Sequence, residues 1–151
     1  MYLKKVYSKQ KTLVVLLFIT AIVSFLSCSK EVPVDDIDFQ RHLVAGTGTY
    51  ENTKKIWKLD SLAIDGKPYV LSTNQKKYTK TFNHNGAYMD SDGFAGVWEI
   101  AKLDELTHTS TSTTGTKVTN VYKILEVNSA QLNIQLLGTT SKYEYFFIIS
   151  N

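Results

Sequence analysis

The stretch "KYTKTFNHNGAYMDSDGFAGVWEI", residues 77 to 100, alternates short runs rich in threonine and aromatic residues with two-residue turn signals. Asn85-Gly86 and Asp92-Gly93 are typical of tight hairpin turns, because these residue types tolerate a positive φ. No long helical pattern competes over these residues. The stretch therefore predicts three consecutive antiparallel strands joined by short turns.

The same pattern continues on both sides of this stretch, from Lys54 to the last residues of the sequence. Asp65-Gly66 adds a hairpin signal, and the whole sequence holds only two prolines, which would interrupt strands. Eight or nine strands are predicted, at a spacing of about ten residues. This spacing indicates an all-β protein, either a sandwich or a meandering barrel.

The first long strand changes the phase of its alternation. Trp57 and Leu59 form the apolar face of its first half, whereas Leu62 and Ile64 form that of its second half. Since side chains alternate with a period of two, a slip of one residue would turn the strand over. We therefore expect a β-bulge near Ser61, which absorbs the slip and keeps both halves facing the core.

The last predicted strand is apolar on both faces. Tyr143, Tyr145 and Phe147 alternate with Phe146 and Ile148. A strand of this composition is expected to be covered on its outer face or to lie centrally in the protein.

The segment 36–44 precedes the strands and differs from them. Asp35 or Asp36 could cap a helix of two turns, and Gly46 could end it. We interpret the segment as a short helix that closes one end of a barrel. The alternative is a disordered tether.

The first 28 residues are typical of a membrane-targeting leader. Four lysines precede an apolar run of fourteen residues, Leu13 to Leu26, and the first 27 residues contain no acidic side chain. The run is shorter than the roughly 20 residues of a membrane-spanning helix and matches the apolar region of a signal peptide. Phe25-Leu26-Ser27-Cys28 then resembles a bacterial lipobox, which implies cleavage before Cys28 and acylation of its thiol.

The alternatives for Cys28 are a free thiol or one half of a disulfide, but the sequence contains no second cysteine. Interpretation of these residues as a lipobox divides the chain into a signal peptide (1–27), a lipidated tether that includes the short helix (28–45) and a β domain (46–151). Serine at position 29 implies outer-membrane sorting, on the periplasmic face or at the cell surface. Cys28 is thus expected to hold the protein on a membrane.

Removal of the leader changes the charge of the chain. The full sequence carries 17 basic and 14 acidic residues, and the four leader lysines leave 13 against 14, a net charge of about −1. The basic balance of the full sequence is therefore no argument for nucleic-acid binding, and no nucleic-acid partner is expected.

The β domain resembles the lipocalin-like lipoproteins common in Bacteroidetes. The resemblance rests on the order of several short motifs between about Gly46 and Phe147, and it covers most of the chain after the leader. It implies an antiparallel up-and-down β-barrel of about eight strands with an interior cavity. The motifs are Trp57-Lys58-Leu59, Asp65-Gly66-Lys67, Lys77 to Phe82, Asn85-Gly86, Asp90 to Gly93, Gly96-Val97-Trp98-Glu99 and the closing "YEYFF".

Motifs for common catalytic and cofactor chemistry do not occur in the sequence. It has no Gly-x-Ser-x-Gly, no His-Glu-x-x-His and no glycine-rich phosphate loop. His42, predicted in the helix, His84, predicted on a strand, and His108, in the Thr-rich run 107–116, have no ligand spacing for a metal. Asp90-Ser91-Asp92-Gly93 favours a hairpin turn over a calcium loop, because Tyr88 would occupy the first ligand position. We therefore expect no enzyme activity, no cofactor and no metal.

Aromatic side chains are the best candidates for ligand contacts, because small-molecule pockets are mostly apolar with a few polar groups. The alternative is a filled core, since barrels of eight strands are either packed solid or hold one small ligand. Two functions follow: a non-catalytic binding module for a small apolar ligand, or a surface interaction protein, such as an adhesin, inhibitor or accessory subunit, that contacts a protein or glycan. The candidate ligand-binding residues are Trp57, Tyr78, Phe82, Trp98, Tyr122 and Tyr145.

Overall fold

The computed structural model of the chain describes residues 36–46 and 53–150. Residues Asp35–Asn151 form one compact unit. The predicted signal peptide (1–27), the acylation of Cys28 and the first part of the tether lie outside the described residues and stay predictions. None of the helices in the described ranges is long and apolar enough to cross a membrane.

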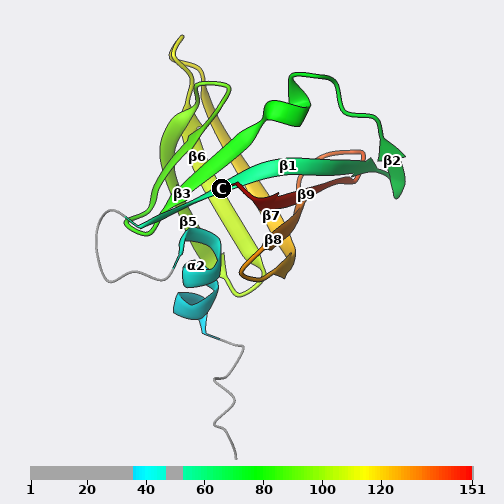
Figure 1. The fold of residues 1–151 in the computed structure, drawn as a ribbon. Coiled ribbons are helices and arrows are strands. Elements are labelled where there is room, and N and C mark those ends of the chain that lie inside the picture. The colour runs from blue at the N-terminus through cyan, green and yellow to red at the C-terminus, as the bar shows by residue number, and fades with distance from the viewer. Residues whose placement is uncertain (1–35, 47–52, 151) are drawn as a thin grey trace, which may run out of the picture. The chain divides into compact units, whose positions relative to one another are not determined.

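The described chain is an antiparallel β-barrel with one α-helix at one end (Figure 1). In chain order, the elements are α2 (Ile37–Ala45), β1 (Lys54–Ile64), β2 (Lys67–Tyr69), the 3-10 turn η1 (Gln75–Lys77), β3 (Thr79–Asn83), β4 (Ala87–Asp90), β5 (Ala95–Lys102), β6 (Glu105–Thr111), β7 (Lys117–Val127), β8 (Gln131–Leu136) and β9 (Tyr143–Ile149).

Consecutive strands are neighbours in the sheet from β3 to β9, so the topology is up-and-down. Pairing of β1 with β9, from Trp57↔Ile149 to Ile64↔Tyr143, closes eight strands into a barrel, and β2 is one extra strand beside the far end of β1. The expected lipocalin-like barrel is therefore confirmed, and the sandwich alternative is wrong.

The predicted turns are present. Gly86 and Gly93 have φ values of 88° and 85°, and Asp65 and Gly66 have φ values of 52° and 75°. At these positions the chain reverses between β3 and β4, between β4 and β5, and between β1 and β2. A positive φ is reached at little steric cost by glycine, which explains its place in each reversal.

The predicted bulge is also present, because the register between β1 and β9 shifts between Leu59 and Ser61. Trp57, Leu59 and Leu62 are all buried despite the break in their spacing. The extra residue lets one long strand keep its apolar side chains inside while it bends around the barrel.

Gly96 has a steric role in the wall. A Cβ atom at this position would lie 2.1 Å from the carbonyl oxygen of Thr109 on β6. The close approach of β5 and β6 therefore requires glycine, and it accounts for the first residue of the Gly96-Val97-Trp98 motif.

The prediction for the last strand was wrong in one respect. β9 lies between β8 and β1, but no described element covers its outer face, where Ile148 is 39% exposed. Closure of the barrel explains the difference, since it gives β9 hydrogen-bonding neighbours on both sides without a second layer outside.

Helix α2 begins and ends as predicted. The carboxylate of Asp36 accepts a hydrogen bond from the Asp38 backbone N–H at 2.8 Å, and Gly46, with φ 100°, follows the last helical residue. Val44 and Ala45 are fully buried. The helix thus closes one end of the barrel, as expected.

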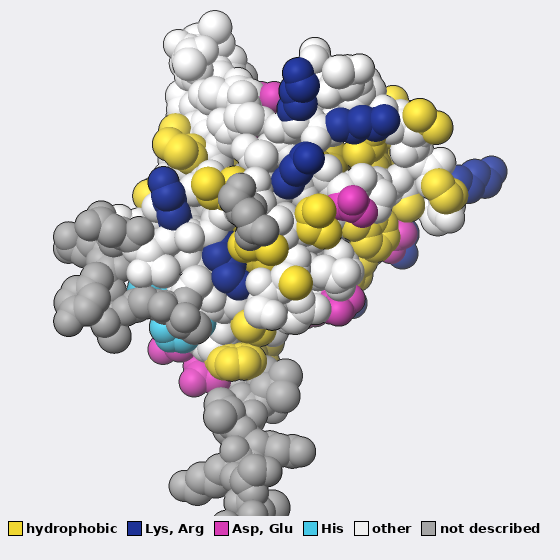
Figure 2. Space-filling view, in the orientation of Figure 1, with side chains coloured by type: hydrophobic (Ala, Val, Ile, Leu, Met, Phe, Trp, Pro, Cys, Tyr) yellow, Lys and Arg dark blue, Asp and Glu magenta, His cyan; other side chains and the backbone are white. Residues whose placement is uncertain are grey.

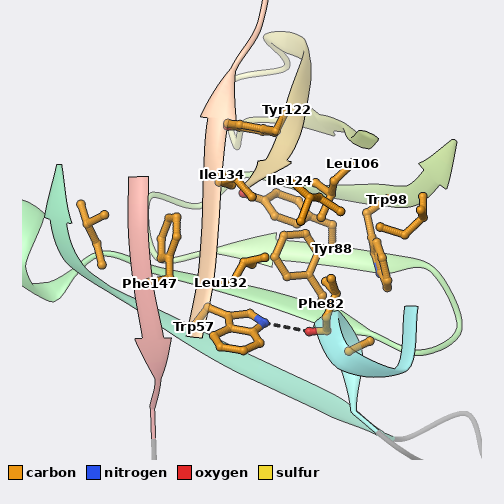
Figure 3. Packing of buried hydrophobic residues seen from close by; sticks show 14 of the residues in the cluster. Trp57, Phe82, Tyr88, Trp98, Leu106, Tyr122, Ile124, Leu132, Ile134 and Phe147 are labelled. Carbon is orange, nitrogen blue, oxygen red and sulfur yellow. Dashed lines mark hydrogen bonds between the residues drawn. The ribbon is translucent and has the colours of Figure 1, made fainter. Parts of the chain in front are cut away.

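Trp57 joins this helix to the barrel. Its indole N–H donates to the Val44 carbonyl at 2.7 Å and points toward α2 (Figure 3). Lys55, also on β1, donates from Nζ to the Leu43 carbonyl at 2.7 Å. Two side chains of β1 therefore satisfy carbonyls in the last turn of α2, which the helix itself leaves without partners.

Tightly packed side chains fill the half of the barrel next to α2 (Figure 3). Phe82 and Trp98 meet edge to face, with ring centroids 5.2 Å apart. Leu106, Leu132 and Ile134 are completely buried around them. These residues form the hydrophobic core of the barrel.

We predict that Trp57→Phe lowers the free energy of unfolding by about 1–3 kcal/mol, because the buried Val44 carbonyl loses its indole donor. Denaturant unfolding measures this loss, and hydrogen exchange should show faster exchange of the α2 amides.

Trp98→Phe is the matched control, because its indole donates at 2.8 Å to the Asn83 carbonyl instead. It should cost a similar amount without changing exchange in α2. Unchanged α2 exchange in Trp57→Phe would contradict the proposed link.

Candidate functional site

A cavity of about 260 Å³ occupies the barrel near η1. In Figure 1, α2 and the coil of η1 lie at opposite ends of the barrel. One end is therefore filled and covered by a helix, and the other is hollow. The cavity is lined by Leu59, Asn74, Gln75, Tyr78, Lys80, Asp92, Tyr122 and Tyr145.

Lys80 is the unusual member of this lining, because its side chain is only 3% exposed. Alternation along β3 turns it inward between Tyr78 and Phe82. Its Nζ donates to the Tyr88 hydroxyl at 2.8 Å and lies 3.3 Å from Nε2 of His108. Burial lowers the pKa of Lys80 to about 8, and the negative charges of Asp90 and Asp92 oppose this shift.

Aromatic rings surround the Lys80 ammonium. Nζ lies 5.4 Å from the ring centre of Tyr78, 5.1 Å from that of Tyr88 and 5.4 Å from that of Tyr122. These distances are within the range of cation–π attraction, which strengthens where water is excluded. The rings therefore provide part of the stabilisation that an ion pair would give.

Asp90, on β4, organises the hydroxyl groups of the site. Its Oδ2 accepts from the hydroxyls of Tyr78 at 3.1 Å and Tyr88 at 2.9 Å. Its Oδ1 accepts from the backbone N–H groups of Asp92 and Phe94, both at 3.0 Å. These four bonds occupy the carboxylate and hold the hairpin turn that the sequence predicted.

His108, on β6, is also buried, at 2% exposure. Its ring stacks between Tyr88, at 4.2 Å and 12°, and Tyr122, at 5.4 Å and 27°. Burial, together with the nearby charge of Lys80, lowers the pKa of His108 to about 3. A neutral ring that accepts from Lys80 at Nε2 carries its proton on Nδ1, which has no partner in the described residues.

The tyrosine hydroxyls keep their protons near neutral pH. Burial raises the pKa of Tyr78, Tyr88 and Tyr122, and the charge of Asp90 raises each of them further. The site therefore contains neutral hydroxyl groups around the ammonium of Lys80.

Three of the six candidate ligand residues, Tyr78, Tyr122 and Tyr145, line the cavity. The other three, Trp57, Phe82 and Trp98, belong to the buried core cluster and are not among the residues that line this cavity.

Sequence reasoning missed the polar members Lys80, Tyr88, Asp90 and His108. The alternation that turns Tyr78 and Phe82 inward also turns Lys80 inward, and this was the one available signal.

The other two histidines lie away from the cavity. His84 was predicted on a strand but lies in the turn between β3 and β4. The prediction was wrong because the turn includes His84 as well as the Asn85-Gly86 pair. In the turn, the ring of His84 stacks on that of His42 of α2, with ring centroids 4.8 Å apart. Within residues 36–46 and 53–150, no group of three or more His, Cys, Asp or Glu side chains is arranged to hold a metal ion.

Comparison with protein-family models, with curated proteins and with solved structures finds no match to this chain.

We predict that Lys80→Met raises the free energy of unfolding by about 1–4 kcal/mol near neutral pH, because an apolar side chain of similar length avoids desolvation of the ammonium. Denaturant unfolding measures the gain. Lys123→Met, at an exposed position on β7, is the control and should change stability by less than about 0.5 kcal/mol.

The gain should depend on pH. The pKa of Lys80 is about 8 in the folded protein, whereas its ordinary value, which applies to the unfolded chain, is 10.5. Between these two pH values the unfolded chain therefore binds more protons than the folded protein does. The free energy of unfolding of the wild type therefore increases as the pH rises through this range, and the stability advantage of Lys80→Met becomes smaller. An advantage that is absent, or constant with pH, would contradict the cost assigned to Lys80.

Proposed function

We propose that this protein is a lipid-anchored binding module that holds one small ligand at the open end of its barrel. The cavity of about 260 Å³, lined by Tyr78, Tyr122 and Tyr145, is the observation that carries this proposal. Small-molecule pockets have volumes of about 300–1,000 Å³ and combine apolar walls with a few polar groups. A cavity near the lower limit suits a compact ligand.

Asp90 and His108 are poor candidates for general acid–base catalysis. The carboxylate of Asp90 already accepts four hydrogen bonds, and His108 has a pKa of about 3. His108 is therefore not poised to take up a proton near neutral pH, and the acceptor positions of Asp90 are already used. Lysines on the face in Figure 2 are scattered singly, which argues against a basic patch for nucleic acid on that face.

A surface interaction protein is the second candidate. Met89 on β4 and Val97 on β5 are 50% and 63% exposed on the outer wall. They lie on paired strands, with Met89 opposite Ala95 and Val97 opposite Ala87. An exposed apolar group of this kind is a candidate contact for a partner protein or glycan.

A neutral, environment-sensitive apolar dye separates the two candidates. With residues 35–151, we expect saturable binding of one dye per molecule, measured by fluorescence titration. Asn74→Trp, which places an indole at the exposed cavity lining, should weaken binding at least about tenfold.

The matched variant Val97→Asp should leave dye binding unchanged, because this side chain points out of the barrel. Loss of binding in Val97→Asp, with retention in Asn74→Trp, would favour the surface interaction protein instead.

The membrane anchor is a separate part of the proposal. It rests on the lysines, the apolar run and the lipobox-like residues Phe25 to Cys28, and Ser29 supports sorting to the outer membrane. Two or more acyl chains give stable anchoring, because each buried methylene contributes about 0.8 kcal/mol.

Cys28→Ala is expected to abolish incorporation of labelled fatty acid and to release the protein from the membrane fraction. Cys28→Ser is a more conservative substitution that also removes the thiol, and it should behave in the same way. A variant that still carries the label would show that another residue is acylated.

A further inference from the structure

We infer that the ligand of this cavity carries a single negative charge, a carboxylate on a compact apolar or aromatic body, and that Lys80 binds this carboxylate. The inference rests on the proposed binding function and names the chemical class of the ligand.

The ammonium of Lys80 lacks a direct counter-ion among the described residues. The ion pairs found there, within 4.0 Å, are Lys102–Glu105 and Lys142–Glu144, and neither includes Lys80. Both acceptors around Nζ, the Tyr88 hydroxyl and His108 Nε2, are neutral groups. A buried charge with neutral partners is costly, so its presence at the wall of a cavity points to a ligand of opposite charge.

One hydrogen-bond donor of Lys80 is also available. An ammonium group has three N–H donors. Within the described residues, two of them are directed to Tyr88 and His108, at 2.8 and 3.3 Å. Lys80 lines the cavity, so a ligand oxygen there could accept the third N–H.

Asp90 does not accept the third N–H of Lys80. Its two oxygens accept from the hydroxyls of Tyr78 and Tyr88 and from two backbone N–H groups. Because the Tyr88 proton is directed to Asp90, the Tyr88 oxygen can accept from Lys80. The network therefore holds Lys80 in position and leaves its remaining donor to the cavity.

The rest of the lining sets the size and the charge of the ligand. Leu59, Tyr122 and Tyr145 provide apolar and aromatic surface around a volume of about 260 Å³. Asp92 also lines the cavity but is exposed, so water screens its charge. Lys80 is the one cationic residue among those that line the cavity, so one carboxylate is matched there and a second negative charge would lack a partner.

Benzoate and benzamide are suitable probes, because they have nearly the same shape and only benzoate is charged. Equilibrium dialysis with the full chain in a non-ionic detergent should show saturable binding of both, with benzoate about ten- to a hundredfold tighter. Lys80→Met should remove the preference for benzoate and leave benzamide binding in place. Asp92→Asn should bind benzoate as well as, or better than, the wild type.

The pH dependence provides an independent readout. Benzoate needs the ammonium form of Lys80, whose pKa in the free protein is about 8. Benzoate affinity should therefore fall about tenfold per pH unit well above pH 8, while benzamide affinity stays constant. The raised pKa values of the tyrosines and the lowered pKa of His108 keep these neighbours uncharged across the same window. The groups that face Lys80 are Tyr78, Tyr88, Asp90, Asp92, His108 and Tyr122.

The outcomes distinguish this inference from the proposed function. Equal binding of benzoate and benzamide, unchanged in Lys80→Met, would overturn the anionic ligand and leave the binding cavity standing. Binding of neither probe would overturn both. Tighter benzoate binding that is lost in Lys80→Met and weakens above pH 8 supports the carboxylate site.

Discussion

The pairing of β1 with β9 is the constraint on which the rest of the structure depends. It closes the sheet, and along it the register of β1 shifts between Leu59 and Ser61. Before the shift β1 also pairs with β3, and beyond it β1 pairs with β2. One bent strand therefore closes the wall, carries Trp57 and Lys55 to the helix, and carries Leu59 to the cavity.

Much of this fold could be predicted from local sequence. Turn dipeptides, alternation of side chains and the change of phase at Ser61 are local signals that predicted the strands and the bulge, and the capping residues Asp36 and Gly46 predicted the helix. Sandwich and barrel share these signals. Only the resemblance to lipocalin-like proteins separated them, because closure depends on two strands far apart in the sequence.

The candidate site was less predictable for a physical reason. Aromatic residues were expected in a cavity because of their type, and three of the six line it. Trp57, Phe82 and Trp98 instead pack in the filled core. Whether an inward side chain belongs to the core or to the cavity depends on its depth along the barrel axis, and the alternation of side chains does not encode this depth. Lys80 was missed because lysine is rarely buried, and its network joins strands β3, β4, β6 and β7.

The position of α2 has a further consequence for how molecules move through the barrel. In the part of the chain that the structure describes, α2 and the packed side chains beside it occupy the end of the barrel opposite η1. If the cavity near η1 binds a ligand as proposed, uptake and release are both expected on the side of η1. Under that proposal, the arrangement suits storage or presentation of a ligand better than its transfer through the barrel.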